Sequence, residues 1–217
     1  MPSGDDRAAV QEAIRGAILR GDYAPRQRLI EAELCERFGS SRFEIRNALQ
    51  DLASHGLVEF QPNRGARVRE ITFAEVIEIT EVRRMLEGFE AARAAERVTK
   101  AEAAVLKQIT RDMRAAVSRS ELLRYSELNK QLHGAIRDIA AHETSARLLR
   151  QLRDQTVRHQ FSLSLVPGRP SVSLPQHEAI VEAVIAKDPS AAEAAMHAHL
   201  QSVIEAFRAL SAAVAQP

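Results

Sequence analysis

The sequence has very little cysteine and no long apolar run, and these two absences exclude several classes of protein. With Cys35 as its single cysteine, the chain cannot form an internal disulfide, which agrees with a reducing compartment. No stretch approaches the roughly 20 apolar residues that a membrane-spanning helix needs. The polar first residues also lack the features of a secretory signal. We therefore expect a cytoplasmic protein without a membrane partner.

An excess of one sign of charge is also lacking, because 30 lysines and arginines nearly balance 29 aspartates and glutamates, and the formal net charge is only +1 over 217 residues. That value is weak for a nucleic-acid-binding protein, so any contact with nucleic acid must depend on where the cations are placed. The composition is 45% hydrophobic and 27% charged, as in ordinary globular proteins, and the length suits one or two domains. A change in sequence texture divides the chain into residues 1–70 and 71–217.

The first of these segments contains the pattern of a helix-turn-helix. Leu34 and Phe38 lie four residues apart, as the apolar face of a short helix requires, and Gly39 follows where a left-handed C-cap is needed. Ser41 then precedes Glu44 by three residues, which is the spacing of a capping box at the start of a second helix.

The second helix is predicted to present two different faces. Its core-facing residues recur at helical spacing and are Ile45, Leu49 and Leu52. The residues on or beside the outward face are Arg42, Phe43, Arg46, Asn47 and Gln50. Arginine can bind guanine through two hydrogen bonds, Asn or Gln can pair with adenine, and an aromatic ring can contact a thymine methyl. The outward face therefore suits the major groove of duplex DNA.

A β-hairpin with a basic tip follows this helix. Residues 57–60 and 66–69 alternate between apolar and polar side chains, as strands do, and the turn between them contains Arg64 and Gly65. A wing of this kind would place Arg64 along a DNA backbone or in a minor groove. The alternative is an arginine-rich solvated helix followed by an ordinary hairpin.

Residues 7–70 also resemble the N-terminal domain of the GntR-type transcriptional regulators. The resemblance joins separated motifs in register: Gly21-Asp22-Tyr23-Ala24-Pro25, Leu29-Ile30-Glu31, Gly39-Ser40-Ser41-Arg42, Ile45-Arg46 and Asn63-Arg64-Gly65. It implies that Arg42, Arg46 and the Arg64-Gly65 tip contact the operator. Arg26 stands where the family usually has glycine, and Phe43-Glu44 and Asn47 replace its usual Thr-Pro and Glu. These departures leave the operator sequence open.

The second segment is predicted to be a bundle of about six helices, which makes the fold class mainly α. Capping boxes that begin at Thr72, Thr99 and Ser118 predict helices from near 73, 100 and 119. A further helix should span about 143–165. Two more starts are expected where Ser173 and Asp188 precede the segments that contain Pro175 and Pro189.

Histidines on the apolar faces of three of these helices carry a second signal. Asn129 and His133 lie four apart on one inward face, while His177 and His199 fall on two others, and His197 is expected on an exposed face. Each histidine alone is more often a hydrogen-bonded core residue. Three together on apolar faces need something to satisfy their nitrogens, and a divalent metal such as zinc or nickel would do so.

Residues 71–213 resemble the FCD domain, the ligand-responsive helical domain of the FadR-like branch of the same regulators. The matching residues are Asn129, His133, His177 and His199, together with Arg83 and Glu87 in the first bundle helix. The resemblance implies a metal with open coordination positions beneath a pocket for a small organic acid. Arg83 could grip the far end of that anion, or could be a surface cation, and Arg158 and His159 are further candidates for the pocket.

Together these observations lead us to expect a homodimeric, ligand-responsive transcription factor that reads a palindromic double-stranded operator. One alternative is a metal-dependent hydrolase, since three neutral ligands around an open metal also describe a catalytic site. Against it, no carboxylate among Glu127, Glu143 and Glu178 has a clear placement as a general base. A third interpretation keeps DNA binding but makes the metal purely structural.

Overall fold

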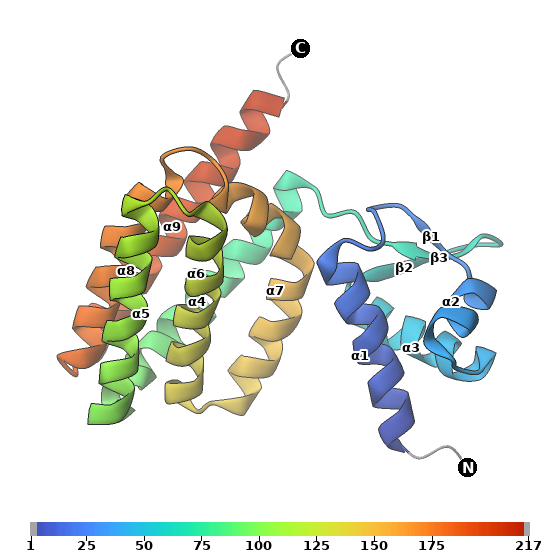
Figure 1. Ribbon diagram of the computed structural model, residues 1–217, viewed down its shortest axis with the longest axis horizontal. Coiled ribbons are helices and arrows are strands. Elements are labelled where there is room, and N and C mark those ends of the chain that lie inside the picture. The colour runs from blue at the N-terminus through green and yellow to red at the C-terminus, as the bar shows by residue number, and fades with distance from the viewer. Residues whose placement is uncertain (1–3, 215–217) are drawn as a thin grey trace. The chain divides into compact units, whose positions relative to one another are not determined.

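The computed structural model of the protein describes the backbone of residues 4–214 and the side chains of residues 8–213. By their contacts the residues form two compact units (Figure 1), one of residues up to 71 with 153–157 and one of residues 72–152 with those from 158 onward. The expected fold class is confirmed: a small three-stranded sheet lies in the first unit, and the second unit is helical. None of the helices within residues 4–214 has the length and apolar character that a bilayer crossing requires.

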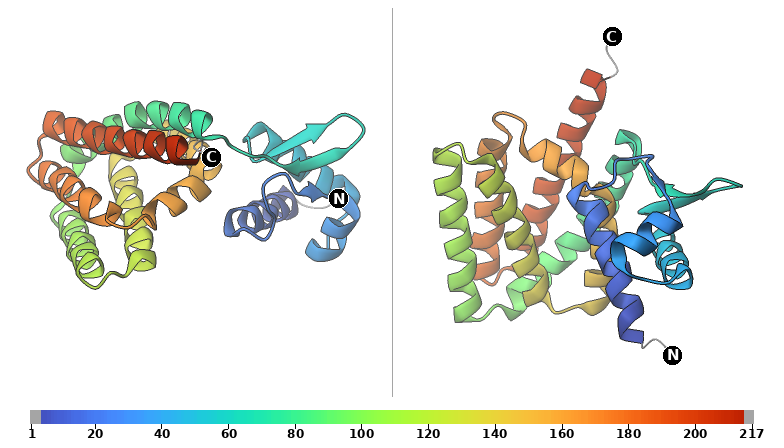
Figure 2. Two further views of the ribbon diagram at one scale, coloured as in Figure 1. Left: turned by 90° about the horizontal axis from the view of Figure 1, so that it is seen from above. Right: turned by 45° about the vertical axis from the view of Figure 1, so that its right-hand side comes forward.

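The first unit packs three helices against a small antiparallel sheet. Its elements are α1 (Gly4–Arg20), β1 (Arg28–Leu29), α2 (Glu31–Phe38), α3 (Arg42–Ser54), β2 (Val58–Gln61) and β3 (Gly65–Val68). The strand order is β1-β3-β2, and the β2–β3 hairpin projects from the unit as a wing (Figure 2). The apolar core of this unit is built around fully buried Ile14, Leu34, Ile45, Leu49 and Leu52.

The helix-turn-helix forms as the sequence predicts. Gly39 adopts the left-handed conformation at the C-cap of α2, with φ at 64°, which favours glycine. At the start of α3 the Ser41 hydroxyl accepts from the Glu44 amide, and the Glu44 carboxylate accepts from the Ser41 amide at 2.8 Å. The capping box is therefore confirmed, and it accounts for an acidic side chain near the arginines.

Two elements of the first unit are not anticipated by local sequence patterns. Helix α1 buries Ile14, Ala17 and Ile18 in the core of the unit. Strand β1 has only two residues, which pair with Arg67 and Ala66 of β3. A strand this short shows no alternation in the sequence, because it exists only through pairing with residues far along the chain.

The second unit contains six helices within the described residues. They are α4 (Phe73–Arg97), α5 (Lys100–Ser118), α6 (Leu122–Ala140), α7 (Glu143–Ser164), α8 (Arg169–Ile185) and α9 (Pro189–Val214). The predicted starts near 73, 100, 143 and 189 are confirmed. Helix α4 packs most extensively against α9, and Figure 2 shows the two running side by side.

Two predicted helix starts are wrong. Helix α6 begins at Leu122 and not near 119, because Ser120 adopts a left-handed φ of 58° and the Ser118 hydroxyl donates to the Ala115 carbonyl at the end of α5. Helix α8 begins at Arg169, ahead of Ser173, and Pro175 lies inside it. Gly168 forms the N-cap there with φ at 80°, a conformation that glycine adopts without strain.

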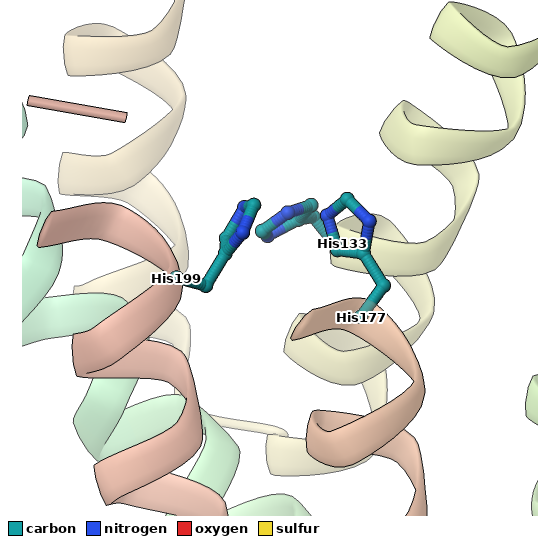
Figure 3. Close-up of side chains that lie close together, drawn as sticks. All are labelled: His133, His177 and His199. Carbon is teal, nitrogen blue, oxygen red and sulfur yellow. The ribbon is translucent and has the colours of Figure 1, made fainter. Parts of the chain in front are cut away.

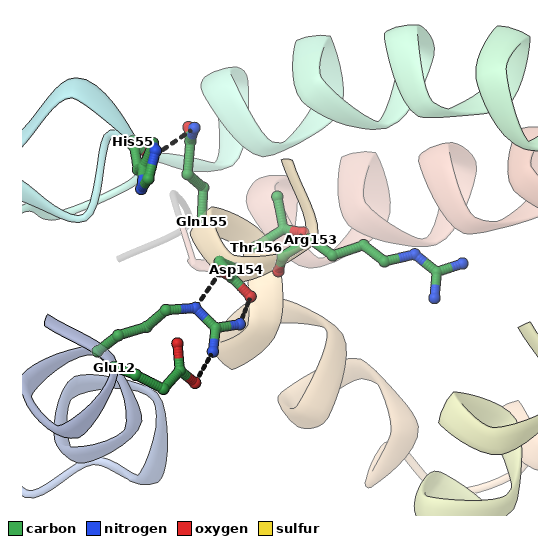
Figure 4. Close-up of polar contacts among 7 residues, drawn as sticks. Glu12, His55, Arg153, Asp154, Gln155 and Thr156 are labelled. Atoms are coloured by element: carbon green, nitrogen blue, oxygen red, sulfur yellow. Dashed lines mark hydrogen bonds and ion pairs between the residues drawn. The ribbon is translucent and has the colours of Figure 1, made fainter. Parts of the chain in front are cut away.

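Residues 153–157 of α7 belong to the first unit by their contacts. The Arg15 guanidinium donates to both carboxylate oxygens of Asp154 at 2.6 Å and also bonds Glu12 at 2.6 Å (Figure 4). The Gln155 amide donates to the His55 carbonyl at 3.0 Å. These hydrogen bonds explain why residues 153–157 group with the first unit, since bidentate arginine–carboxylate pairs are strong and geometrically specific.

The close approach of α4 and α9 depends on Gly88. A Cβ added at this position would overlap the imidazole of His197, whose Nε2 is buried with no hydrogen-bond partner among the described residues. The expectation that His197 lies on an exposed face is therefore wrong, since its side chain is half-buried. Helical periodicity does not reveal that the facing helix carries a glycine and can approach this closely.

We expect Gly88→Ala to lower the free energy of unfolding by about 1–3 kcal/mol, because the added methyl group overpacks this contact. Gly134→Ala is the matched control, since a Cβ there would meet only the Arg137 guanidinium at 3.5 Å. It should stabilise the protein by about 0.5–1 kcal/mol through helix propensity. Urea denaturation measures both variants. The clash explanation fails if Gly88→Ala is neutral, or if adding His197→Ala does not relieve the loss.

Candidate functional site

The outward face of α3 carries the residues predicted to contact DNA. Arg42 and Arg46 are exposed, and Phe43 is 74% exposed although it is an aromatic residue. Asn47 lies beside them, half-buried. Because the opposite face of α3 is fully buried in the core, the helix is anchored firmly while these side chains remain accessible.

Arg46 already has an anionic partner. Its Nε and Nη2 donate to the two carboxylate oxygens of Glu31 at 3.1 and 3.0 Å, and this hydrogen bonding raises the pKa of the Arg46 guanidinium. Glu31 is the first residue of α2, so the ion pair ties the two helices of the motif together. A DNA phosphate or guanine would have to replace this carboxylate. Arg42 forms no ion pair within the described residues.

The wing adds a second concentration of arginines. Arg64 is exposed at the tip, and the neighbouring Gly65 has a φ of 77° that favours glycine. A hollow of about 220 Å³ lies beside the wing, lined mainly by Arg26, Arg28, Gln61, Arg64 and Arg67. Arg26 pairs with Glu70, and Arg67 pairs with Glu59. The remaining positive charge favours anionic groups near the tip.

Three buried histidines from three different helices meet inside the second unit (Figure 3). They are His133 of α6, His177 of α8 and His199 of α9, and each offers one ring nitrogen within 4.8 Å of those of the other two. All three are at most 6% exposed. The ring centroids of His177 and His199 are 4.3 Å apart, and each lies 5.5 Å from that of His133. The sequence predicted these three residues as one group.

Each imidazole is held through Nδ1 by a different outer partner. His133 Nδ1 lies 2.8 Å from the Glu87 carboxylate, and His199 Nδ1 lies 3.0 Å from Gln176 Oε1. Carboxylate and amide oxygens only accept, so both rings carry their proton on Nδ1. The third ring, His177, has its Nδ1 3.0 Å from the Tyr125 hydroxyl.

This arrangement leaves the Nε2 atoms for the centre of the cluster. The protonated Nδ1 atoms of His133 and His199 leave a lone pair on each Nε2. His177 Nε2 is buried without a hydrogen-bond partner in the described part of the chain, and so is Asn129 Oδ1, one helical turn before His133. Buried polar atoms without partners are costly, and a cation bound to the lone pairs of these atoms would remove that cost. The donor set of three imidazoles and one amide oxygen suits zinc or nickel.

The electrostatic environment keeps two of these rings, those of His177 and His199, neutral. Burial lowers the pKa of His177 well below its usual range, and the neighbouring His199, His133 and Arg169 lower it further. Burial likewise lowers the pKa of His199, followed by the effects of His133 and Arg169. Burial also raises the pKa of the Tyr125 hydroxyl, so this group stays protonated. Neutral imidazole is the form that binds a metal.

Arg83 is directed at a protein carboxylate. It is 3% exposed, and its Nε and Nη2 donate to Glu87 Oε1 at 2.9 and 2.7 Å. The other oxygen of Glu87 is the one that contacts His133. The alternative of a surface cation is therefore wrong, and the two donors that were expected to bind an effector both bind one oxygen of Glu87.

The two remaining pocket candidates, Arg158 and His159, are half-buried. The His159 ring packs edge-on against Phe73 and Phe207, with ring centroids 5.3 and 6.4 Å away. Burial lowers the pKa of both Arg158 and His159. The ring contacts of His159 are thus with these two phenylalanines, on α4 and α9, and not with the histidine cluster.

Three residues near the cluster are missed by sequence patterns. Tyr125 lies four residues before Asn129 on the same face of α6. Gln176 precedes His177 and reaches across to α9. Arg169 stands in a segment that the sequence predicts as a loop. The i, i+4 spacing from Tyr125 through Asn129 to His133 is the signal that could have identified the first.

Comparison with known families agrees with the two units. The family model for the FCD domain matches residues 78–202, and the model described as bacterial regulatory proteins, gntR family, matches residues 7–68. The chain belongs to the GntR family and carries an FCD domain. A curated relative, the HTH-type transcriptional repressor RspR of Escherichia coli, is 30% identical over 199 residues, which cover 92% of this chain and 87% of that protein.

Other relatives of this GntR-family chain give the same result. The HTH-type transcriptional regulator LutR of Bacillus subtilis is 28% identical over 207 residues, covering 86% of this chain and 94% of LutR. Among solved structures, McbR/YncC of E. coli superposes with a TM-score of 0.77 at 21% identity, covering 97% of this chain and 99% of that one. A putative GntR regulator from Rhodococcus sp. RHA1 has a TM-score of 0.72 at 20% identity, covering 94% and 97%. The protein is a transcriptional regulator of the GntR family.

The lowered histidine pKa values predict how the metal-free GntR-family protein responds to acid. An imidazole whose pKa is lower in the folded state than in the unfolded chain binds protons preferentially once the chain unfolds. The contribution of these two neutral rings to the free energy of unfolding is therefore fully present above the ordinary histidine pKa of 6.5 and is lost as the pH falls below it.

We expect the urea midpoint of chelator-treated protein to decrease between about pH 7.5 and about pH 5.5. The double variant His177→Gln/His199→Gln, measured in parallel, should show a flatter dependence over this range. A wild-type midpoint that stays constant across the range would contradict the assignment of buried, neutral rings.

Proposed function

We propose that this protein is a homodimeric transcriptional regulator that reads a palindromic duplex operator and responds to a small carboxylate through a divalent metal in its FCD domain. The observation that carries the proposal is the convergence of three buried imidazoles whose Nδ1 atoms are already engaged by outer partners. Family membership supports the regulator, and the cluster supports the metal and its ligand.

DNA contact is assigned to the outward face of α3 and to the wing. The proposed contact residues are Arg42, Phe43, Arg46, Asn47, Arg64 and Gly65. The exposure of both recognition-helix arginines and of the large Phe43 ring supports this assignment, because an exposed aromatic side chain suits a thymine methyl. The small net charge means that affinity must come from these few placed cations, with strong dependence on salt.

The operator is first selected from a pool of random duplexes. Arg42→Ala and Arg46→Ala should each weaken the binding free energy for this operator by about 1–3 kcal/mol and relax specificity at one base position. Arg114→Ala is the control, since it removes the same charge from an exposed arginine of the second unit. Electrophoretic mobility shift titrations at fixed salt measure the effect. Unchanged affinity in both α3 variants would discard α3 as the recognition helix.

The metal ligands are proposed to be His133, His177 and His199 through Nε2, with Asn129 through Oδ1. These residues would hold an ion that supplies a Lewis-acidic centre, to which a further ligand would bind as the coordination expands beyond four. Glu87, Gln176 and Tyr125 orient the rings from behind, as outer hydrogen bonds do in metal sites generally. The orphaned amide oxygen of Asn129 supports its inclusion.

Wild-type protein should retain zinc or nickel through dialysis, and His133→Ala should lose it. Glu87→Gln keeps the shape of the outer partner but removes its charge, and should lower metal affinity about 10- to 100-fold. His55→Ala removes an imidazole of the first unit and should change nothing. Elemental analysis and competition with a chromophoric chelator provide the readouts. Equal metal content in wild-type and His133→Ala protein would rule out the site.

The carboxylate nature of the effector follows from charge. All four proposed ligands are neutral, and the nearby Glu87 carboxylate is already paired with Arg83. The charge of a bound divalent ion would therefore remain largely uncompensated, and a small organic anion bound to the ion would balance it. Regulation requires this anion to bind two arrangements of the bundle with different affinity.

A further inference from the structure

Arg169 is a half-buried arginine of the helical bundle whose hydrogen-bonding capacity is only partly used. It is the first residue of α8, and its Nη1 donates to the hydroxyl and the carbonyl oxygen of Ser202 on α9, at 3.0 and 3.3 Å. Its Nη2 is buried and has no hydrogen-bond partner in the part of the chain that the structure describes. Burying a guanidinium with unused donors is costly unless a ligand completes its bonding.

The position of Arg169 connects it to the histidine cluster. Arg169, Ser173 and His177 are spaced four residues apart along α8, so they share one face of that helix. Burial raises the pKa of the Tyr125 hydroxyl and Ser173 opposes this shift, and the hydroxyl lies 3.0 Å from His177 Nδ1. The charge of Arg169 lowers the pKa of both His177 and His199, as expected for a cation near both rings.

Arg169 also differs from Arg83 in how its charge is balanced. Arg83 donates two hydrogen bonds to the buried carboxylate of Glu87, so the pair is neutral. No carboxylate forms an ion pair with Arg169 among the described residues. Burial lowers the pKa of Arg169, and the carboxylate of Glu205, which opposes this shift, accepts its hydrogen bond from Gln201.

We propose that Arg169, and not Arg83, binds the carboxylate of the effector, with Nη2 as the donor. This inference rests on the proposed metal site, because the anion is attracted by the bound ion and by Arg169 together. A guanidinium held at Nη1 by Ser202 presents Nη2 in a fixed direction, which reduces the entropy lost when a carboxylate binds. Arg169 therefore selects anions over neutral metal ligands.

The test uses the full-length protein loaded with Co²⁺, whose visible spectrum reports changes in coordination. Acetate and succinate are titrated as carboxylate probes, and imidazole as a neutral probe that also binds the metal. In Arg169→Gln we expect the affinity for both carboxylates to fall roughly tenfold or more, since a charge-assisted hydrogen bond is lost. The affinities for Co²⁺ and for imidazole should stay at their wild-type values.

Two further variants separate binding from folding. Arg208→Gln removes the same charge from an exposed ion pair with Glu81 on the same unit and should leave every affinity unchanged. Ser202→Ala keeps the charge of Arg169 but removes one anchor, and should weaken carboxylate binding less than Arg169→Gln does. This order of effects is not expected if Arg169 only bridges α8 and α9.

The outcomes are distinguishable. If Co²⁺ does not bind the wild-type protein, the metal site and this inference both fail. If Co²⁺ binds but neither carboxylate changes the spectrum, or both bind Arg169→Gln as tightly as wild type, the inference about Arg169 fails while the metal site stands. Parallel loss of imidazole and carboxylate affinity would assign Arg169 a structural role and would also overturn the inference.

Discussion

The candidate metal centre depends on one buried carboxylate, that of Glu87. Its side chain is 2% exposed, and it can remain ionised there because one oxygen accepts from Arg83 and the other contacts His133. This pairing fixes the His133 proton on Nδ1 and directs the Nε2 lone pair toward His177 and His199. It also cancels the charge of Arg83. A cation at the centre would therefore meet neutral ligands, which is why an anion is the expected effector.

The first unit is subject to a different electrostatic constraint, which concerns attraction to DNA. The chain as a whole is nearly neutral, so the attraction to DNA has to be concentrated on one face. In the proposed interface the arginines of α3 and of the wing provide this concentration, while Glu31 holds Arg46 in a partnered conformation. The ion pair with Glu31 restricts the Arg46 side chain in the free protein. If Arg46 binds DNA, this ion pair has to break, and its loss lowers the net free energy gained on binding the operator.

The limits of sequence interpretation follow from how far apart the interacting residues are. Asn129 and His133 were predictable as neighbours because a helix brings residues four apart together. That His177 and His199 join His133 was an inference from apolar faces, and the close approach of the three rings agrees with it. The Arg83–Glu87 pair is local, because the two residues lie four apart on α4. The contact of Glu87 with His133 and the bond between Gln176 and His199 have no local signature, since each depends on the exact packing of separate helices.

The sequence alone determined the local elements: the turn at Gly39, the capping box of α3, the hairpin and most helix starts. Each rests on hydrogen bonds between residues within a few positions of one another, so the neighbours along the chain are sufficient to specify it. Tertiary structure alone decided which partner each buried polar group finds. It placed His197 against Gly88 and Arg169 against Ser202. Those choices depend on the distance and rotation between helices, which are set by the packing of the whole core.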